Sequence, residues 1–517
     1  MKICILLQRR FAFIGHNLAL LLKETYGVQE FCGYVSWRPA YDFLRSQKEI
    51  TYSSLLFDED IHASYKHETL DIAYLKGMEA EIGIPNLWGI IAPDRVLMFN
   101  QLVREYPYHT PRYTYEEILR IFQVTAKAVV SFMDTERPDA VILPNGGGIG
   151  AMILFQIAKK RGIKIFHIMP GALPDRFVVS DSYFSYSGVE KIFKKTFNEN
   201  KQNALYQNAK DLLEDFRKQP IAYNADLTPE SQPVNRLRQM RFLLPKNLLR
   251  SAHWFGHLLR EYFDGHSRYD YTYTHPWYYL VDHTKRKINN AIGVNDLYDP
   301  FDINTPYVFF GLHYEPEVSI LLQAPFMTDQ INIIRQMARS LPVGYYLYVK
   351  DHPLMAQFRP RSYYKELKKI PNVRLMDAKL RSFDIIKHAR LVSTITGSVI
   401  WEGLLLGKPA ISFGHQFYNV LSMVKYVHEI EQLPYLVKQQ LENFQYNEEE
   451  LLHYIAAILA DSAVLKFYYL WEKETDEVKK KNGLLPLVEI IAKKLDLKVH
   501  NTSAVDKNKR LPKSLFR

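Results

Sequence analysis

Three polar segments in the second half of the chain carry residue types that can hold an anionic ligand. They are residues 313–317 (His-Tyr-Glu-Pro-Glu), 350–353 (Lys-Asp-His-Pro) and 393–398 (Ser-Thr-Ile-Thr-Gly-Ser). Each follows a short apolar run that is typical of a buried strand. Ligands of open parallel sheets bind beyond the carboxyl ends of the strands, where loops and helix N-termini meet. We therefore expect the three segments to contribute to one binding site.

The segment 393–398 has the composition of a phosphate site. It offers hydroxyl groups and, directly before a predicted helix, backbone N–H groups at the positive end of the helix dipole. His352 can donate a hydrogen bond to a phosphate, and Pro353 fixes the chain direction just after it. The alternative is that the loop only caps the helix with Ser or Thr. Its coincidence with a His-Pro turn on a neighbouring strand favours the phosphate.

Glu402 lies four residues after Ser398, one turn into the predicted helix. With Ser398 as the N-cap, the capping-box position would be Trp401, so the capping box does not explain Glu402. A carboxylate at this place can accept hydrogen bonds from ribose hydroxyls, as acidic residues do in nucleotide sites. We therefore predict a nucleotide role for Glu402.

These residues resemble a known family. Residues 350–353, 396–403 and 407–411 look like the capsule polysaccharide biosynthesis glycosyltransferases, bacterial enzymes with two Rossmann-like domains (the GT-B fold). In the related sialyl- and Kdo-transferases a His-Pro motif and a Ser/Thr motif hold the phosphate of CMP. The resemblance thus implies a nucleotide-sugar donor, with a CMP-activated ulosonic acid such as Kdo favoured. With the other polar residues at the strand ends, the predicted donor-binding set is His313, Glu317, Lys350, His352, Ser393, Thr394, Thr396, Gly397, Ser398 and Glu402.

Glycosyl transfer also needs a carboxylate, either to deprotonate the acceptor hydroxyl or to attack the anomeric carbon. The resemblance implies that this acid lies in the N-terminal domain, near a glycine in the loop after a strand. The matching loop is 167–175, where no acid precedes Gly171. Asp175 and Asp181 are the nearest substitutes and become the candidate catalytic residues. A turn or N-cap role for either is the alternative.

Two further motifs have residue types that could bind a ligand. Residues 58–60 (Asp-Glu-Asp) fit the Asp-x-Asp pattern that binds a divalent metal in other glycosyltransferases, but such triplets arise by chance in acidic loops. We predict no metal and no cofactor. Residues 145–150 (Asn-Gly-Gly-Gly-Ile-Gly) follow a predicted strand and open a helix, but they lack the Lys-Ser/Thr of a P-loop. We expect the backbone at Asn145, Gly146 and Gly147 to approach the acceptor, or simply to form a tight turn.

Short β-rich runs alternate with helical patterns in both halves of the chain. Between residues 140 and 168, a strand, a glycine-rich turn, a helix and a second strand follow one another, which is typical of a parallel sheet. A second series begins at Pro306. The sequence predicts an α/β fold with two Rossmann-like domains facing a cleft, a helical connector and C-terminal helices. The predicted parts are 1–200 (acceptor domain), 201–300 (helical, basic connector), 301–445 (nucleotide-sugar domain), 446–500 (C-terminal helices) and 501–517 (basic tail).

The composition and net charge of the chain indicate a globular protein with anionic partners and exclude a disulfide scaffold. The 517 residues are 47% apolar and 24% charged, as in globular proteins. The two cysteines, Cys4 and Cys32, are too few for a disulfide scaffold and suit the cytoplasm. The net charge of +10 favours anionic partners. Residues 236–260 hold six basic residues and no acid among leucines and aromatics, so this stretch can lie on an anionic membrane or pack as a helix with a basic rim.

We therefore predict a cytoplasmic glycosyltransferase of surface polysaccharide synthesis, peripheral on the inner membrane. Its partners are a nucleotide-sugar donor, a saccharide or lipid-linked acceptor and an anionic membrane surface. Nucleic acid is not expected, because no recognition motif accompanies the positive charge. One alternative is a teichoic-acid-type CDP-polyol phosphotransferase, which shares this fold and a His-Pro turn. Another is a non-catalytic glycan-assembly protein, which the missing acid before Gly171 favours.

Overall fold

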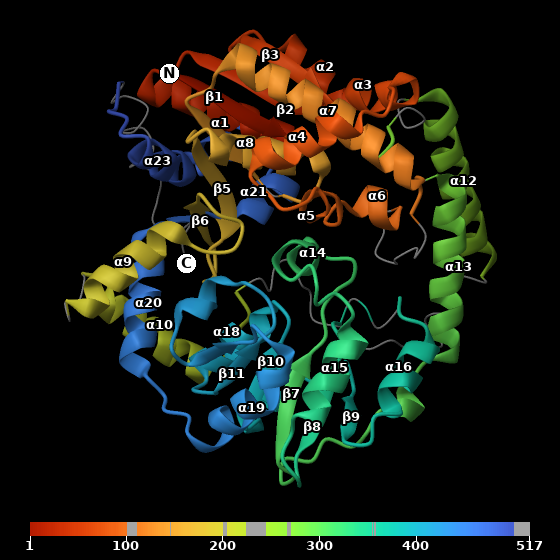
Figure 1. Cartoon of the computed structure of the whole chain (residues 1–517), viewed down its shortest axis with the longest axis vertical. Coiled ribbons are helices and arrows are strands. Elements are labelled where there is room, and N and C mark those ends of the chain that lie inside the picture. The colour runs from red at the N-terminus through yellow and green to blue at the C-terminus, as the bar shows by residue number, and fades with distance from the viewer. Residues whose placement is uncertain are drawn as a thin grey trace. The chain divides into compact units, whose positions relative to one another are not determined.

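The computed structural model divides the chain into two compact units (Figure 1). Unit 1 consists of Met1–Ile91, Tyr113–Val189 and the residues from Ile458 onward, and unit 2 consists of Ala92–Arg112 and Glu190–Ala457. The structure describes residues 1–100, 111–144, 146–199, 204–223, 244–265, 270–273, 275–353, 355 and 358–500.

Unit 1 is built on a seven-stranded sheet of order β13-β6-β5-β4-β1-β2-β3. The strands from β3 to β5 are parallel, whereas β6 runs antiparallel to both β5 and β13. Apolar residues of β1 and β2 meet those of the flanking helices in one core. The strands are β1 (Lys2–Leu7), β2 (Glu30–Val35), β3 (Tyr52–Phe57), β4 (Ala140–Leu143), β5 (Lys164–Pro170), β6 (Arg176–Ser180) and β13 (Ser462–Val464).

The helices of unit 1 include the crossovers that a parallel sheet requires. The 16-residue helix α1 connects β1 to β2, and α8 connects β4 to β5. The helices are α1 (Phe11–Tyr26), α2 (Arg38–Ser46), α3 (Asp58–Ser64), α4 (Ile72–Ile82), α5 (Trp88–Ile91), α7 (Tyr115–Glu136), α8 (Ile149–Lys160), α21 (Phe467–Glu472), α22 (Glu477–Gly483) and α23 (Leu485–Lys494), with α9 (Ser187–Asn198) and α20 (Glu448–Ala460) at the unit boundaries.

Unit 2 is built on a six-stranded sheet of order β12-β11-β10-β7-β8-β9, in which every pair is parallel. Helices cover both faces. Val308 and Phe310 of β7 pack with α15 (Gln330–Arg339), α16 (Arg361–Lys368) and α19 (Leu433–Glu442). Tyr307 and Phe309 pack with α17 (Ser382–His388) on the other face. This alternation is the period of two of a strand buried on both sides. The strands are β7 (Tyr307–Gly311), β8 (Tyr346–Lys350), β9 (Val373–Met376), β10 (Leu391–Thr394), β11 (Ala410–Ser412) and β12 (Val424–Tyr426).

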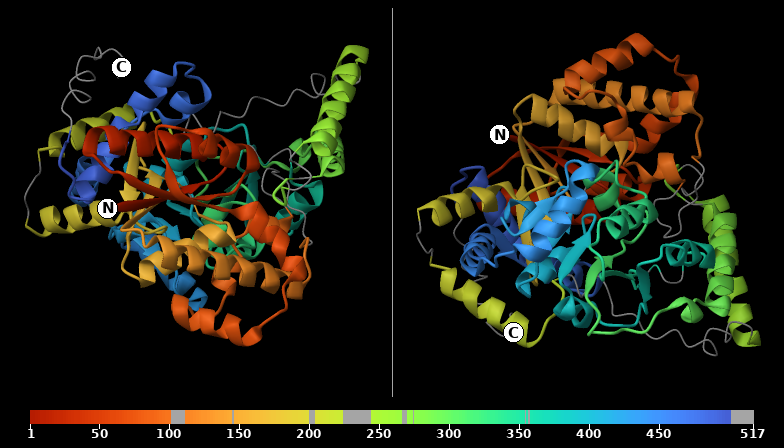
Figure 2. Two further views of the ribbon diagram at one scale, coloured as in Figure 1. Left: turned by 90° about the horizontal axis from the view of Figure 1, so that it is seen from above. Right: turned by 60° about the horizontal axis from the view of Figure 1, so that its bottom comes forward.

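The other helices of unit 2 lie in the connector and around the second sheet. In the connector, α12 and α13 lie side by side (Figure 2). None of the described helices combines the length and apolar character needed to cross a membrane. The helices are α6 (Arg95–Phe99), α10 (Tyr206–Lys218), α12 (Pro245–Asp264), α13 (Pro276–Ile292), α14 (Val318–Gln323), α15 (Gln330–Arg339), α16 (Arg361–Lys368), α17 (Ser382–His388), α18 (Ser398–Leu405) and α19 (Leu433–Glu442).

The predicted α/β class with two sheets is confirmed. The C-terminal part differs from the prediction of helices alone, because β13 adds a strand to the first sheet. A three-residue strand is too short to leave a hydrophobic period. Residues 236–243 and the predicted tail 501–517 lie outside the described residues.

Candidate functional site

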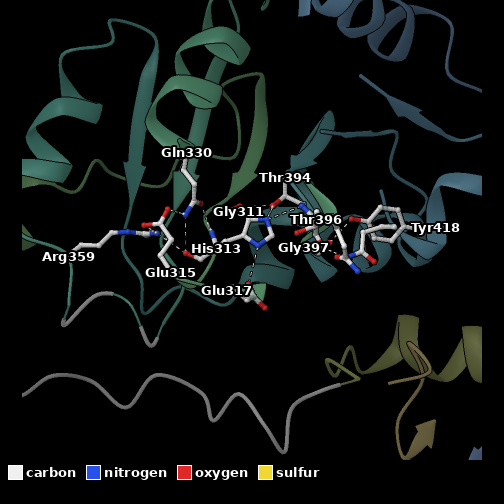
Figure 3. Close-up of polar contacts among 12 residues, drawn as sticks. Gly311, His313, Glu315, Glu317, Gln330, Arg359, Thr394, Thr396, Gly397 and Tyr418 are labelled. Carbon is white, nitrogen blue, oxygen red and sulfur yellow. Dashed lines mark hydrogen bonds and ion pairs between the residues drawn. The ribbon is translucent and has the colours of Figure 1, made fainter. Parts of the chain in front are cut away.

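The predicted donor-binding residues gather at the carboxyl ends of β7, β8 and β10. β7 pairs with β8 on one side and with β10 on the other, so the strand order reverses direction between β7 and β10. Such a switch point is where open parallel sheets bind their ligands. Figure 3 shows the polar contacts that form there.

His313 joins the end of β7 to the loop after β10. Its Nε2 lies 2.9 Å from Thr394 Oγ1 and accepts a 3.0 Å hydrogen bond from the Thr396 N–H. Since that bond needs a lone pair on Nε2, the proton of the neutral ring is on Nδ1. Nδ1 lies 3.5 Å from Glu317 Oε2. The imidazole is thus held between a carboxylate and the hydroxyl loop (Figure 3).

Glu317 supplies negative charge beside this imidazole. Burial acts to raise the pKa of Glu317, but the hydrogen bond and charge of His313 hold it below its ordinary value. The side chain is still 41% exposed. Glu317 is therefore an accessible carboxylate at neutral pH that also orients His313.

The first turn of α18 has no side-chain cap. Its N-cap is Gly397, and the Ser398 hydroxyl donates instead to Glu402 Oε1 at 3.1 Å. The interpretation of the loop as a Ser or Thr cap is therefore wrong, as is Ser398 as the N-cap. A Cβ on Gly397 would lie 3.1 Å from Thr394 Oγ1, so glycine lets the loop pack closely. Uncapped N–H groups at a helix start suit an anion.

The Thr396 hydroxyl is the unsatisfied polar group of this loop. It is buried and has no hydrogen-bond partner within the described part of the chain. The Thr396 carbonyl accepts from Gln416 Nε2 at 3.0 Å, and Gln416 also donates to Gln323 Oε1 at 2.5 Å. An unpaired buried hydroxyl costs about 1–3 kcal/mol. A bound ligand is one way to satisfy it.

Glu402 and Lys350 are buried under the same end of the sheet. Burial raises the pKa of Glu402 to about 7, against the opposing effects of the Ser398 hydrogen bond and the Lys350 charge. Burial likewise lowers the pKa of Lys350, whose Nζ donates to Ser382 Oγ at 3.3 Å. Glu402 thus exchanges its proton near neutral pH, where it can both donate and accept hydrogen bonds.

A buried ion pair braces the loops that follow β7 and β8. Asp351 accepts hydrogen bonds from the Arg359 guanidinium and, at 2.6 Å, from the Tyr364 hydroxyl. Arg359 also donates to the His313 carbonyl at 2.7 Å and lies 3.3 Å from Glu315 Oε2. Burial acts to lower the pKa of Arg359, but the negative charge of Asp351 holds the pKa of Arg359 above its ordinary value. Arg359 therefore stays charged and fixes the His313 backbone.

Sequence reasoning missed the residues that position this site. Arg359 follows the His-Pro turn, and Gln330 begins α15, where its Oε1 accepts from the His313 N–H at 2.7 Å. Tyr418 donates to the Gly397 carbonyl at 3.1 Å. Tyr223 has a pKa raised by burial and by the charges of Glu402 and Glu317, which places it near both. None of them belongs to a recognisable motif, and spacing carries no signal for them.

Ser393 lies elsewhere than expected, whereas His352 stays among the predicted donor residues, within reach of the charges of Glu317 and His313. The Ser393 side chain is fully buried, and its hydroxyl donates to the Ile411 carbonyl at 3.0 Å. Its prediction as a ligand contact is corrected: the hydroxyl bonds within the sheet. His352 lies beside Tyr314, with ring centroids 5.8 Å apart, and burial lowers the pKa of His352 to about 4. The imidazole against the hydroxyl loop is His313, and His352 is neutral at pH 7.

The candidate catalytic residues lie in unit 1. Asp175 is in the turn that joins β5 to β6, with a φ of 54°, a conformation that Asp tolerates better than most residues. Its carbonyl accepts from the Leu465 N–H at 2.9 Å. Asp181 follows β6 and is exposed. Asp175 thus has the geometry of a turn residue, and a catalytic role for either aspartate stays a prediction.

The other two motifs of unit 1 follow β4 and β3, which β1 and β2 separate in the sheet. Gly146 and Gly147 connect β4 to α8, and a Cβ on Gly146 would lie 2.6 Å from the Tyr183 ring. This close approach favours the tight-turn interpretation, while Asn145 lies outside the described residues. In the acidic triplet, Asp58 accepts a hydrogen bond from the Tyr34 hydroxyl.

The rest of the acidic triplet is paired with Arg38. The Arg38 N–H donates to Glu59 Oε1 at 2.9 Å, and its guanidinium donates to Asp60 at 2.7 Å. Over the residues that the structure describes, no three His, Cys, Asp or Glu side chains cluster as metal ligands. The three acidic residues form the first turn of α3, and their contacts tie this turn to Tyr34 and Arg38.

Part of the chain matches a model of a known protein family and a curated protein. Residues 259–454 match the family model of the capsule polysaccharide biosynthesis protein. Protein FixF of Sinorhizobium fredii is 29% identical over 130 residues, which are 25% of this chain and 31% of FixF. The match thus spans about a third of that relative.

Several solved structures are similar at low sequence identity. The β Kdo 2,7 transferase of Thermosulfurimonas dismutans KpsC is 13% identical, with a TM-score of 0.36, over 71% of this chain and 89% of its own. The β Kdo 2,4 transferase of the same protein is 16% identical, with a TM-score of 0.36, over 64% and 82%. Staphylococcus aureus MnaA with UDP is 12% identical, with a TM-score of 0.27, over 96% and 97%.

These TM-scores are below 0.5, so the resemblance rests on the sequence match. The matched residues include the whole second sheet and every donor-binding residue that the sequence predicts. The resemblance is therefore confirmed over this segment. Residues 259–454 are thus similar to the capsule polysaccharide biosynthesis protein family.

Proposed function

We propose that the chain is a glycosyltransferase of capsule polysaccharide synthesis and that unit 2 binds its nucleotide-sugar donor. The observation that carries the proposal is the uncapped start of α18 beside His313 and the unpaired Thr396 hydroxyl. A phosphate there would accept from the first N–H groups of α18 and from Thr396, and the helix dipole would stabilise its charge. The family match over the same residues supports this assignment.

The nucleoside would lie on the side of Glu402. Because its pKa is about 7, Glu402 can accept from one ribose hydroxyl and, when protonated, donate to another. Tyr223 lies close enough to Glu402 for that charge to raise its pKa, and we propose that its ring packs on the base. We propose a CMP-activated ulosonic acid such as Kdo as the donor, on the strength of the His-Pro and Ser/Thr motifs.

The chemistry that we propose is displacement at the anomeric carbon. A carboxylate of unit 1, with Asp175 and Asp181 as candidates, would deprotonate the hydroxyl of a saccharide or lipid-linked acceptor. The new glycosidic bond forms as the bond to the phosphate breaks, and the nucleotide leaves with its negative charge. The α18 N-terminus and Thr396 would stabilise that charge without a metal.

The connector supports a cytoplasmic enzyme at the inner membrane. Helices α12 and α13 expose apolar side chains that include Leu248, Leu249 and Ile288. Lys246, Arg250 and Arg260 add positive charge to α12. An amphipathic basic surface with aromatics binds anionic lipid headgroups. We propose that this surface keeps the enzyme near a lipid-linked acceptor.

Nucleotide binding tests the proposed donor site. Binding of CMP, CDP, UDP and GDP would be measured by calorimetry, and CMP release from CMP-Kdo would be compared with turnover of CDP-glycerol. We expect CMP to bind and His313→Ala to weaken it at least tenfold, because the hydroxyl loop loses its anchor. Since an amide can also accept from Thr396, His313→Gln should retain part of the affinity.

The matched control is His388→Ala, which removes an exposed histidine at the end of α17. Equal CMP affinity in the wild type and His313→Ala would contradict the proposed site. Turnover of CDP-glycerol in place of CMP-Kdo would make the chain a polyol phosphotransferase. Binding of CMP without turnover of any donor would favour the non-catalytic alternative.

A further inference from the structure

Unit 2 contains a pocket whose lining is separate from the proposed donor-binding residues. It has a volume of about 490 Å³ and lies where α12 ends and α13 begins. It includes none of the residues at the strand ends, and its lining residues are Asn100, Arg112, Tyr262, Asp270, Tyr273, His275, Trp277 and Tyr278. A volume of this size is in the ordinary range for small-ligand sites, about 300–1,000 Å³.

One side of the pocket is polar and held by hydrogen bonds. Arg112 donates from Nη1 to the Tyr271 carbonyl at 2.8 Å. Asp270 is buried, and its Oδ1 accepts from the Thr272 N–H at 2.9 Å. His275 caps α13 by accepting from the Trp277 N–H at 3.3 Å. Donors and acceptors therefore line the same small space in fixed positions.

The remaining lining is aromatic. Trp277 and Tyr278 are 57% and 41% exposed although their rings are large and apolar. Tyr262 packs edge-on against the His275 ring, with centroids 4.6 Å apart. Exposed rings beside a polar pocket are costly to leave in water and mark a binding surface. Their faces carry partial negative charge and attract C–H groups.

This combination matches the chemistry of a sugar ring. A pyranose presents C–H groups on its faces and hydroxyl groups around its edge. The faces can pack on Trp277 or Tyr278, and the hydroxyls can bond to donors and acceptors such as Arg112 and Asp270. We propose that this pocket is a saccharide-binding subsite that holds a sugar unit of the acceptor. The inference rests on the proposed function, since it gives the acceptor of that reaction a place on unit 2.

Saturation-transfer NMR on the full chain tests the subsite. The probes are the methyl glycosides of Kdo, N-acetylglucosamine and galactose, each added with and without CMP. We expect saturation transfer to at least one glycoside, and Trp277→Ala should weaken its binding about tenfold by removing an aromatic face. CMP affinity should not change, because Trp277 is not one of the proposed donor-binding residues.

The chain offers a matched control in Trp254, a 39% exposed tryptophan of α12 that packs against Tyr279 and His283 and does not line the pocket. Trp254→Ala should leave glycoside binding intact. Equal glycoside binding in wild type and Trp277→Ala would overturn the subsite, as would no glycoside binding in a protein that binds CMP. Glycoside binding that depends on Trp277 in a protein that binds no nucleotide would keep the subsite and overturn the proposed donor site.

Discussion

Glu402 shows how burial sets the behaviour of one residue in this site. Its carboxyl is buried, so the charged form is disfavoured and its pKa is about 7. In the unfolded chain the same group has an ordinary pKa of about 4.3. Between these values the folded state binds more protons than the unfolded state, so raising the pH through this window weakens folding.

Glu402→Gln should remove this pH dependence. The amide keeps an acceptor for the Ser398 hydroxyl but carries no charge. We expect the variant to match the wild type at pH 5 and to be more stable at pH 8, by about 1–3 kcal/mol. Thermal unfolding at both pH values measures the difference. A wild type that loses no more stability than Glu402→Gln on going from pH 5 to pH 8 would contradict the raised pKa.

At the residue scale, the sequence could predict which segments form the site but not every contact. The polar residues follow apolar runs, and that pattern placed His313, Thr394 and Glu402 at one sheet edge. Which imidazole meets the hydroxyl loop depends on packing by Gln330 and Arg359, which are distant in sequence. The burial of Ser393 has a simpler signal. Alternate residues of a strand face opposite sides, so Ser393 and Thr394 cannot both face one ligand.

Among the described residues of unit 2, the helix pair α12 and α13 has the largest run of exposed apolar side chains. The basic composition of residues 236–260 predicted a helix, and Pro245 begins it at a position where proline is favoured. The apolar exposure of α13 was not predicted, because Pro276–Ile292 has the ordinary composition of an amphipathic helix. Which side chains of α13 are exposed depends on the elements that pack against the helix, and a single sequence does not reveal these elements.

Replacing Leu248 and Leu249 together with glutamate should abolish binding to anionic vesicles. Leu249 is 72% exposed, so the change should leave folding intact while adding negative charge to the proposed membrane surface. Co-sedimentation with phosphatidylglycerol vesicles measures binding, which should also weaken as salt increases. Leu212→Glu, at an exposed leucine of α10, is the control. Unchanged binding by the double variant would discard the membrane surface.

The C-terminal part of the chain belongs to unit 1, together with the N-terminal part, although unit 2 lies between them in the sequence. The residues from Ile458 onward add β13 to the first sheet, and α23 contributes Leu487, Val488 and Ile491 to the core that also holds α1. Sequence reasoning predicted the terminal helices but not which sheet they join. Helical periodicity shows that α23 has an apolar face, and both sheets have helices whose faces would fit it. The partner is decided by tertiary packing.

Leu487→Ala should therefore destabilise unit 1, although the residue follows the whole of unit 2 in the sequence. Leu487 is fully buried, and truncating a buried leucine to alanine costs about 2–5 kcal/mol. In scanning calorimetry with and without CMP, we expect the variant to lower an unfolding transition that CMP does not raise. Val478→Ala, at an exposed valine of α22, should change neither transition. Because CMP should stabilise only the unit that holds α18, a Leu487→Ala effect confined to the CMP-sensitive transition would show that the C-terminal helices support the nucleotide unit instead.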